Sequence, residues 1–415
     1  MALIVQKYGG TSVGNVERIQ NVARRVVRTA AEGHQVAVIV SAMSGETDRL
    51  TDLAHQLNPH PPSREMDVIL NTGEQVTVAL LAMAIEAQGY KSRSFLGHQV
   101  RIRTDSNYQN AKILDIDTKE LVDSLSRGEV AVIAGFQGID ADGNLTTLGR
   151  GGSDTTAVAI AAALKAELCE ICTDVDGVYT TDPNICPEAR KIERISYEET
   201  LEMASLGAKV LHHRSVFFAS KYQVNLSVRS SFNDNPGTLI VPAEESMEQV
   251  VVRAITYDKK AARIRFMGVK DEPGVAAKIF VPIGRAGVNV DLIIQNSSTD
   301  GFTDLTFTVA KEDEERALEL CRRIAEELDA TLDYDSKIAK LSIIGLGMRT
   351  HAGIAATFFD ELAKAGINIE MVSTSEIKVS AVIREDQVDE AVRVLHRAFN
   401  LDKDVVYEES EPAAS

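Results

Sequence analysis

The sequence has few cysteines, no long uninterrupted apolar run, and fewer basic than acidic residues. Four cysteines among 415 residues are too few for a disulfide framework. No stretch approaches the roughly 20 consecutive apolar residues of a membrane span, and the first residues lack the layout of a signal peptide. With 44 Lys and Arg against 61 Asp and Glu, the formal charge of −17 argues against nucleic acid as a partner. We therefore expect a cytoplasmic protein that binds neither nucleic acid nor membranes.

Two of the cysteines, Cys169 and Cys172, form a CxxC pair inside an apolar run. In a strand this spacing would place the two thiols on opposite faces, where they could not share a metal ion. Because free cysteines are commonly buried, we expect both in the core and predict no protein-held metal. The composition, 44% hydrophobic and 25% charged, is that of a globular protein of two or three domains.

The C-terminal part of the sequence repeats itself. Residues 286–291 (AGVNVD) return as residues 365–370 (AGINIE), a shift of 79 positions that also relates Gly274 to Gly353. Each copy has the pattern of a strand, a helix, two strands, a charged amphipathic helix and a short final strand. We predict two βαββαβ units that fill roughly residues 262–408.

The N-terminal region alternates short apolar runs with helical patterns. Strands are expected at residues 3–6, 36–40, 130–134 and 169–173, and helices at residues 16–31 and 66–86. Such alternation predicts an α/β domain built on a buried sheet. The domain boundary is expected within residues 242–249, an acidic stretch that follows a turn-forming segment.

Residues 7–14 read KYGGTSVG and lie between the first strand and the first helix. Paired glycines let the backbone approach an anion, a helix N-terminus directs N–H groups toward it, and Lys7 adds a positive charge. The motif matches neither the P-loop nor the dinucleotide fingerprint. It predicts a phosphate-binding loop, with an ordinary glycine turn as the alternative.

A second glycine cluster, residues 149–156 (GRGGSDTT), also precedes a helix. Arg150 can bind an anion with two parallel hydrogen bonds, and Asp154 lies near the helix start. The alternative, in which Ser153 or Asp154 only caps the helix, does not account for an arginine among glycines. Two anion-binding loops in one domain suggest two anionic reactants.

A third cluster, residues 173–183 (TDVDGVYTTDP), follows a predicted buried strand. In open α/β sheets ligands lie beyond the C-terminal ends of the strands, which is where this segment would be. Taken alone, its Asp-Gly and Asp-Pro pairs are equally typical of a turn.

Together these motifs resemble those of the aspartate kinases, members of the amino-acid kinase superfamily. The resemblance is carried by residues 7–12 (KxGG[TS]S), 149–154 (GRGGSD), 173–183 (the nucleotide segment) and 207–212 (GAKVLH). The repeats resemble the paired ACT domains of that family. The resemblance implies a three-layer αβα sandwich as the amino-acid kinase domain over residues 1–245, and ACT domains over residues 262–336 and 337–408.

The reaction implied by the resemblance moves the γ-phosphoryl group of ATP to the β-carboxylate of L-aspartate, the first step of lysine, threonine and methionine biosynthesis. ATP would act with Mg²⁺ held mainly by the phosphates. An aspartate carboxylate is already ionised at neutral pH, so no general base is needed. Positioning and charge stabilisation must then carry the catalysis.

By the resemblance, Lys7 neutralises the transferring group, Asp154 orients Lys7 or the phosphates, and Arg150 completes the catalytic set. The residues expected at the nucleotide are Lys7, Tyr8, Gly9, Gly10, Ser12, Thr173, Asp174, Tyr179, Asp182 and Lys209. Those expected at aspartate are Ser41, Thr47, Glu74, Arg150, Gly151, Gly152 and Ser153. Glu74 would meet the α-amino group and Arg150 a carboxylate, although a glutamate on a helix is more often solvated.

Two positions depart from the family's pattern. His213 stands where proline is frequent, and Asn184 where arginine is. The second change removes a potential phosphate contact.

The ACT units are expected to bind amino-acid effectors, because they are most similar to those of members that respond to lysine and threonine together. The expected contacts are Asp271, Glu272, Pro273, Gly274, Val275, Ala276, Asn289, Val290, Asp291, Gln295, Asn368, Ile369 and Ser375. Lysine is assigned to Asp271, residues 289–291 and Ser375, and threonine to the others together with Asp271. The alternative is that the repeats only dimerise.

The repeats are also expected to hold a homo-oligomer together. An internal translation start at Met247 would give a separate regulatory chain, as in α2β2 assemblies of the family. Two competing hypotheses are another acid or nucleotide kinase of the superfamily and an amino-acid sensor with an inactive kinase domain. The sensor predicts loss of Lys7, Arg150 or Asp154, and all three are present.

Overall fold

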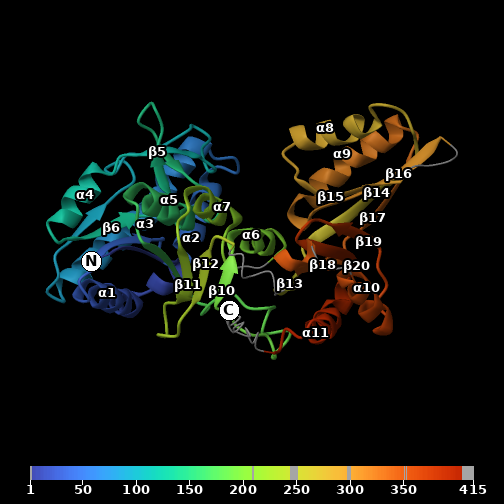
Figure 1. Ribbon diagram of the computed structural model, residues 1–415. Helices are drawn as coiled ribbons and strands as arrows, with labels where there is room; N and C mark the ends of the chain where they lie inside the picture. Colours follow the sequence, from blue (N-terminus) through green and yellow to red (C-terminus); the bar gives the residue numbers. More distant parts are fainter. Residues whose placement is uncertain are drawn as a thin grey trace, which may run out of the picture. The chain divides into compact units, whose positions relative to one another are not determined.

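The computed structural model describes residues 2–207, 210–243, 251–296, 301–349, 351 and 353–403. Two compact units make up the chain (Figure 1). The first comprises Met1–Val178, Lys191–Ser205 and Lys209–Glu245; the second comprises Tyr179–Arg190, Leu206–Ala208 and Ser246–Ser415.

The first unit is built on an eight-stranded sheet of order β10-β12-β11-β9-β1-β2-β6-β3. Its strands are β1 (Leu3–Tyr8), β2 (Gln35–Val40), β3 (Ser92–Phe95), β6 (Val130–Ala134), β9 (Leu168–Thr173), β10 (Arg194–Ser196), β11 (Leu226–Ser230) and β12 (Thr238–Val241). Neighbouring strands are parallel except β11 and β12. A smaller sheet contains β4 (Ile102–Thr104), β5 (Ile113–Ile116), β7 (Gln137–Ile139) and β8 (Leu145–Thr147). The predicted α/β sheet is confirmed.

Helices cover both faces of the large sheet, which gives three layers. On one face α1 (Val16–Ala31) and α3 (Ser63–Glu86) share a hydrophobic core with the valines of β2. The side chain of Asn15 caps α1 by accepting a hydrogen bond from the Arg18 N–H at 2.9 Å. On the other face lies α5 (Gly152–Leu164), whose alanine-rich sequence is buried over most of its length. The other helices of the unit are α2 (Glu46–Leu57), α4 (Lys119–Ser126), α6 (Tyr197–Ser205) and α7 (His213–Tyr222).

Within the described ranges, helix α3 is long and apolar enough to cross a membrane, judged by length and composition alone. The sequence, which lacks an unbroken apolar run, argued against such a span. In the fold α3 buries Asp67, Asn71 and Glu74 against neighbouring elements, and it packs on α1 and the sheet. It is a core helix of the first unit.

The first ACT repeat is a continuous βαββαβ unit, as predicted. It runs through β14 (Ala261–Lys270), α8 (Val275–Arg285), β15 (Val290–Gln295), β16 (Phe302–Ala310), α9 (Glu314–Glu327) and β17 (Thr331–Asp335). Its antiparallel sheet has the order β15-β16-β14-β17, and both helices pack on one face of it.

The second repeat completes its sheet with a strand from elsewhere in the chain. It contains β18 (Ile338–Ile344), α10 (Ile354–Lys364), β19 (Met371–Thr374), β20 (Lys378–Arg384) and α11 (Val388–Ala398). No strand follows α11 among the described residues, which end at 403, so the expected final strand is not found there. Its place beside the first strand of the repeat is taken by β13 (Ala254–Asp258), which precedes the first repeat and pairs antiparallel with β18.

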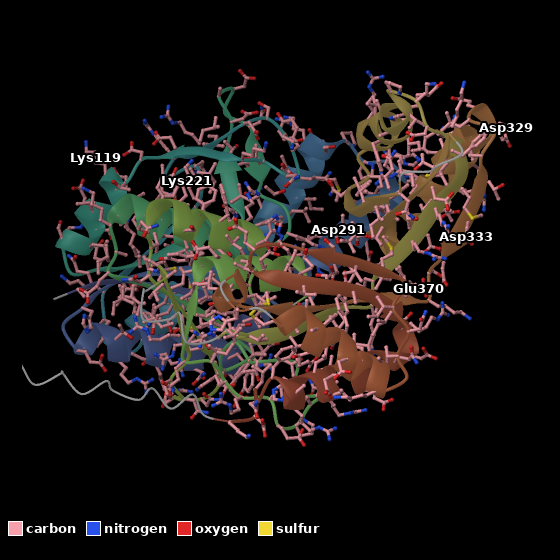
Figure 2. The ribbon with its side chains drawn as sticks, turned by 45° about the vertical axis from the view of Figure 1, so that its right-hand side comes forward. Lys119, Lys221, Asp291, Asp329, Asp333 and Glu370 are labelled. Carbon is pink, nitrogen blue, oxygen red and sulfur yellow. The ribbon has the colours of Figure 1, made fainter. Side chains whose placement is uncertain are left out.

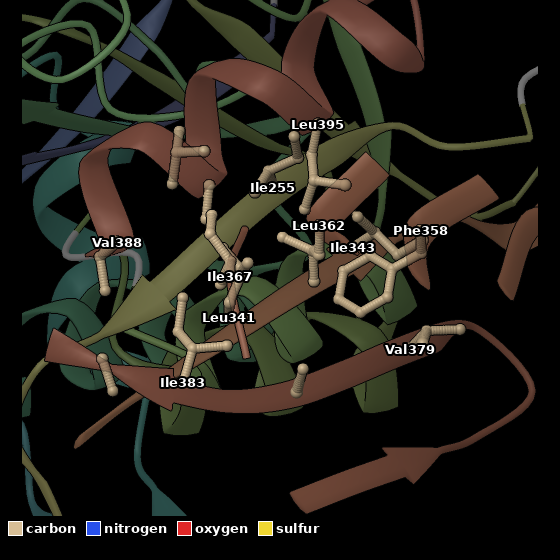
Figure 3. Close-up of a cluster of buried hydrophobic side chains, with 14 of the residues drawn as sticks. Ile255, Leu341, Ile343, Phe358, Leu362, Ile367, Val379, Ile383, Val388 and Leu395 are labelled. Carbon is tan, nitrogen blue, oxygen red and sulfur yellow. The ribbon is translucent and has the colours of Figure 1, made fainter. Parts of the chain in front are cut away.

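The first repeat is therefore inserted into the second. The core of the second repeat shows the result, because Ile255 of β13 packs with Leu341 and Ile343 of β18 and with Leu395 of α11 (Figure 3). The predicted boundary region, residues 242–249, lies largely outside the described residues.

The two cysteines of the CxxC pair lie in β9, and both are buried. Burial raises the pKa of Cys172 to about 12 and also raises that of Cys169, so both thiols stay protonated. The prediction that they belong to the core is confirmed.

Candidate active site

The first glycine motif joins β1 to α1 through a short 3₁₀ turn, Gly10–Val13. Lys7, at the end of β1, forms an ion pair with Asp154 of α5, with 2.7 Å between Nζ and Oδ1. The two side chains are only 11% and 14% exposed, so the pair is largely shielded from water. Asp154 therefore does not merely cap its helix but fixes the lysine of the first motif.

The second glycine motif has a backbone that requires glycine at two positions. Gly149 and Gly151 adopt left-handed conformations with φ of 75° and 67°. A Cβ on Gly151 would lie 2.3 Å from the ring of His212, and one on Gly149 would lie 2.8 Å from the Gln109 carbonyl oxygen. No side chain of the described residues caps the N-terminus of α5, and the first N–H group of the helix, that of Gly152, donates to the Gly149 carbonyl oxygen at 3.0 Å.

Glu74 is buried within α3 and is 3% exposed. Its Oε1 accepts a hydrogen bond from the Ala42 N–H at 3.0 Å, whereas its Oε2 has no hydrogen-bond partner among the described residues. Burial raises the pKa of Glu74 to about 7. The expectation that it differs from an ordinary solvated helix glutamate is consistent with this burial.

Three further glycines let the segments around these residues approach one another closely. A Cβ on Gly10 would lie 3.0 Å from the Ala42 carbonyl oxygen, and one on Gly73 would lie 2.8 Å from the Ala42 Cβ. On Gly135, which follows β6, it would lie 2.7 Å from the Ser153 hydroxyl. The phosphate-loop candidate, the end of β2, helix α3 and the start of α5 therefore converge at the C-terminal ends of the strands, where α/β sheets bind ligands.

The remaining residues predicted to bind aspartate differ in how they are connected to the strand ends. The Ser41 N–H donates to the Tyr8 carbonyl oxygen at 3.1 Å, which ties the end of β2 to that of β1. Arg150 is exposed and has no hydrogen bond or ion pair to other described residues, so its guanidinium is free to meet an anion. Thr47 is exposed in the first turn of α2, and no contact of its side chain links it to the others.

The residues predicted for the nucleotide are linked to the first motif through a serine. Ser12 donates a hydrogen bond to Ser231 at 2.8 Å, and the Ser231 hydroxyl donates to the Thr173 carbonyl oxygen at 3.0 Å. The Thr173 hydroxyl in turn donates to Asp174 at 3.1 Å. These contacts hold the end of β9 against the start of the first motif.

The other two predicted nucleotide residues, Tyr179 and Asp182, belong to the second unit. The Asp182 carboxylate accepts hydrogen bonds from the Tyr257 hydroxyl at 2.8 Å and from the backbone and side chain of Asn184 at 2.9 Å. Asn184, one of the departures from the family pattern, thus serves to fix Asp182. Lys209 lies outside the described residues.

Sequence reasoning missed three residues that hold these segments in place. Besides Ser231, the buried Asp67 accepts hydrogen bonds from the Gln109 N–H and from the Thr147 N–H and hydroxyl. Arg214 donates to the Leu148 carbonyl oxygen at 2.7 Å and so supports the second glycine motif. Ser231 directly follows β11, the neighbour of β9, so the rule that ligands gather at strand ends could have found it.

A polar cavity of about 340 Å³ lies on the opposite face of β1 from Lys7. The Gln6 side chain donates to Glu170 at 2.7 Å, and Arg229 forms an ion pair with Glu170 at 2.9 Å. The lining residues are Ile4, Gln6, Arg25, Arg28, Thr29, Glu32, Glu170, Arg229 and Asp234. This cavity contains none of the predicted site residues.

No group of three or more His, Cys, Asp or Glu within the described ranges could hold a metal ion. The Asp154 carboxylate, at the start of α5, is paired with Lys7.

The predicted effector residues of the first repeat fall at two ends of its sheet. Strand pairing places Gln295 beside Leu305, which pairs with Phe266, whereas Lys270, just before the loop of residues 271–276, pairs with Phe302. Gln295 therefore lies in the half of the sheet that is nearer to this loop. Val290 pairs with Val309 at the other end, so residues 289–291 lie away from that loop within the repeat.

Near residues 289–291 the two repeats exchange ion pairs. Asp291 of β15 pairs with Lys340 of β18, and Glu370 of the second repeat pairs with Arg263 of β14 at 3.2 Å; Figure 2 labels both acidic residues. Of the predicted effector residues in the second repeat, Asn368 and Ile369 lie just before Glu370, and the Ser375 N–H donates to the Lys378 carbonyl oxygen.

Comparison with known families agrees with this architecture. The chain matches the amino acid kinase family model over residues 2–230, and ACT domain models over residues 262–326 and 341–399. An aspartate kinase of Pseudomonas putida is 55% identical over 404 residues, which cover 97% of this chain and 98% of the relative. An aspartokinase of Mycolicibacterium smegmatis is 49% identical over 416 residues, covering 98% of this chain and 99% of the relative.

Solved structures show the same fold. The aspartate kinase from Synechocystis is 46% identical and has a TM-score of 0.55. The match covers 96% of this chain and 69% of the Synechocystis chain. Escherichia coli aspartokinase III, solved with aspartate and ADP, is 24% identical and has a TM-score of 0.80. The match covers 95% of this chain and 99% of the E. coli chain. On the strength of the full-length relatives and the family match, the chain belongs to the aspartate kinases of the amino acid kinase family.

Proposed function

We propose that the protein transfers the γ-phosphoryl group of ATP to the β-carboxylate of L-aspartate and so forms 4-phospho-L-aspartate, in the cytoplasm, as the first step of lysine, threonine and methionine biosynthesis. The observation that carries the proposal is the convergence of two charged groups at the strand ends of the first unit. One is the shielded Lys7–Asp154 pair, and the other is Glu74 with its unpartnered buried oxygen. The first suits a phosphoryl group and the second suits an ammonium group.

In the proposed reaction a β-carboxylate oxygen of aspartate attacks the γ-phosphorus. The bond between that phosphorus and the bridging oxygen breaks, and ADP leaves with the electron pair. Lys7 neutralises the transferring group and Asp154 keeps the Lys7 ammonium in place. The Gly10 amide binds an oxygen of this group, and the Gly9 amide joins it by exchanging its 3.4 Å hydrogen bond to the Cys172 carbonyl oxygen. Mg²⁺ bound to the phosphates would supply further charge neutralisation.

Aspartate would be recognised at both of its ends. The free Oε2 of Glu74 would accept a hydrogen bond from the α-ammonium group, and the unpaired guanidinium of Arg150 would bind a carboxylate. Ser41, Thr47 and the amides of residues 151–153 complete the proposed subsite. The nucleotide would meet Tyr8, Ser12, Thr173, Asp174, Tyr179, Asp182 and Lys209.

We also propose that lysine and threonine inhibit the enzyme in concert through the ACT domains. Escherichia coli aspartokinase III has been solved with lysine and aspartate, which supports lysine as one effector. Residues 271–276, Gln295, Asn368 and Ile369 are assigned to threonine, and Asp271, residues 289–291 and Ser375 to lysine. Because residues 289–291 and Asp271 lie at opposite ends of one sheet, a lysine site that uses both requires a second chain.

Assembly through the ACT domains as a homo-oligomer follows from that requirement. The sequence also allows an α2β2 complex, in which a separate regulatory chain starts at Met247. Met247 lies outside the described residues. Mass spectrometry of the native complex distinguishes one chain length from two.

A coupled assay of ATP consumption tests the activity, with L-aspartate, L-glutamate or no acceptor. We expect turnover with aspartate alone. Turnover with glutamate would indicate another acid kinase, and none with any acceptor would indicate a sensor.

Arg150→Ala tests the assigned role of the free guanidinium. The change should lower kcat/KM for aspartate by about 30- to 1,000-fold, the equivalent of ~2–4 kcal/mol of transition-state binding. Arg127→Ala is the control, because Arg127 is paired with Glu129 on the surface of the same unit. An unchanged kcat/KM in Arg150→Ala would exclude the role.

A further inference from the structure

The segment Tyr179–Arg190 lies within the part of the sequence that matches the amino acid kinase family, residues 2–230, but it folds with the second unit. Its ends lie side by side, because the Ile192 N–H donates to the Val178 carbonyl oxygen and the Thr180 N–H to the Arg190 carbonyl oxygen, both at 2.8 Å. It therefore forms a closed loop, here named loop 179–190. Two residues proposed to bind the nucleotide, Tyr179 and Asp182, lie in this loop.

The backbone of loop 179–190 is attached to the second ACT domain. The Ile255 N–H of β13 donates to the Thr180 carbonyl oxygen at 2.7 Å. On the other side, Arg190 Nε donates to the Leu401 carbonyl oxygen, just beyond α11, at 2.9 Å. The attachment thus involves both the inserted strand and the last helix of that domain.

Side chains of the loop belong to the hydrophobic core of the same domain. Cys186 is 2% exposed and packs in the cluster that contains Leu395 of α11, and Ile185 packs against this cluster. The Tyr257 hydroxyl of β13 donates to Asp182 at 2.8 Å. The position of the loop is therefore set by the second ACT domain.

Within this contact lies one buried polar pair, His396 of α11 and Thr180 of the loop. His396 is fully buried and Thr180 is 3% exposed, and 2.9 Å separates Nε2 from Oγ1. The Thr180 hydroxyl also accepts the Arg190 N–H at 3.0 Å, while His396 Nδ1 has no hydrogen-bond partner among the described residues. Such a pair is costly to separate, because the His396 ring would be left without a hydrogen-bond partner among the described residues and the Thr180 hydroxyl would keep only the Arg190 N–H.

We propose that His396 is a positioning residue for the nucleotide: through its hydrogen bond to Thr180 it fixes loop 179–190, and thereby Tyr179 and Asp182. The inference rests on the proposed role of these two residues. A polar rather than apolar contact specifies one position of the loop, since a displacement that breaks the hydrogen bond leaves the buried His396 ring without a partner among the described residues. The second ACT domain then contributes to nucleotide affinity without touching the nucleotide.

The expected signature is a selective loss of nucleotide affinity. If the loop is correctly placed for only a fraction of the time, the apparent dissociation constant rises by the inverse of that fraction. The residues assigned to aspartate lie outside loop 179–190, so the KM for aspartate should not rise with the dissociation constant of the nucleotide.

The experiment compares isosteric and conservative changes at both partners in the full-length chain. Thr180→Val and His396→Leu remove the hydrogen bond, whereas Thr180→Ser and His396→Gln retain a polar group that can form it. We expect the first two to raise the KM for MgATP and the dissociation constant for ADP about tenfold, the usual size of one buried hydrogen bond. The KM for aspartate should stay within about twofold, and the conservative variants should recover most of the affinity.

A matched control removes a comparable hydrogen bond elsewhere in the same domain. The hydroxyls of Ser342 on β18 and Ser380 on β20 are buried and 2.7 Å apart. Ser342→Ala should lower thermal stability and leave the KM for MgATP unchanged. An equal rise in that KM would mean that general loosening, not loop position, is responsible, and would overturn the proposal.

The inference also fails if folded Thr180→Val binds ADP as tightly as the parent protein. Should His396→Leu not fold, the comparison of Thr180→Val with Thr180→Ser decides, because both keep the histidine. Calorimetric titration with ADP does not depend on aspartate phosphorylation. An inactive parent protein whose ADP affinity still responds to Thr180→Val would refute the proposed function and support the loop contact.

Discussion

At the scale of single residues, Glu74 combines a functional assignment with a cost in stability. Burial raises its pKa to about 7, from 4.5 for a free glutamate. Between these pH values the folded protein keeps a proton that the unfolded chain has lost. The stabilising contribution of this group is therefore complete below pH 4.5 and is lost as the pH rises through 7.

Glu74→Gln should abolish this pH dependence. Relative to the parent protein, the variant should gain about 2–3 kcal/mol of unfolding free energy between pH 5 and pH 8. The same change should lower kcat/KM for aspartate by roughly 100-fold, because an amide binds an ammonium group less strongly than a carboxylate does. Urea unfolding at both pH values and steady-state kinetics at pH 8 measure the two effects.

The control for Glu74→Gln is Glu86→Gln, at the exposed end of the same helix. It should change neither the pH dependence of stability nor the kinetics. If Glu74→Gln and the parent protein lost stability in parallel between pH 5 and pH 8, the carboxyl group would not carry a raised pKa.

Sequence reasoning predicted residues for the site but not the contacts that arrange them. Lys7 and Asp154 were predicted from glycine-rich motifs with a local pattern of glycine and charge, and Glu74 from the family resemblance. Ser231 and Asp67 have no such pattern, and they act through partners more than 40 positions away in the chain. Their role depends on strand order, which short-range patterns do not specify.

At the scale of elements, periodicity predicted the helices and strands well where the signal is local. Helix α1 spans the predicted residues 16–31, because its apolar stripe and its Asn15 cap are both encoded nearby. The origin of the fourth strand in the second ACT sheet could not be predicted in this way. Residues 254–258 pair with residues 340–344, across the whole of the inserted repeat.

A fragment comparison tests the contribution of β13. Residues 247–415 contain β13, whereas residues 261–415 lack it and leave the backbone groups along one side of β18 unpaired. The shorter fragment should melt roughly 10 °C lower and should associate more readily. Calorimetry and analytical ultracentrifugation measure these differences.

Both fragments lack loop 179–190, so their comparison isolates the strand. Equal melting temperatures and equal association would mean that the second repeat completes its sheet without β13.

At the scale of the whole molecule, the net charge of −17 contrasts with two anionic substrates. Beyond a Debye length of ~8 Å at physiological salt the global charge is screened, so the local field decides binding. The shielded Lys7, the free Arg150 and the uncapped start of α5 supply positive potential at the strand ends. The acidic excess therefore bears on solubility more than on substrate choice.

Two ion pairs are exchanged between the two repeats. Each pair joins a basic residue of one repeat's first strand to the acidic residue that ends the repeated AGxNx pattern of the other. Lys340 is only 7% exposed, and its ammonium occupies the Asp291 carboxylate that we assign to the effector lysine. A bound lysine must therefore compete with a lysine of the protein itself.

Lys340→Met should relieve this competition and make inhibition by lysine more sensitive. We expect the lysine concentration for half-inhibition to fall about three- to tenfold, which corresponds to a coupling of roughly 1 kcal/mol, with little change for threonine. A matrix of initial rates against both amino acids, at fixed MgATP and aspartate, measures the shift. Arg263→Met removes the corresponding pair with Glu370 and also a pair with Asp333; neither acidic residue has an assigned effector contact, so the lysine curve of this variant should match that of the parent protein. Identical lysine inhibition curves for Lys340→Met and the parent protein would place the lysine site away from Asp291. Equal shifts in Lys340→Met and Arg263→Met would mean that the exchanged ion pairs act by holding the two repeats together.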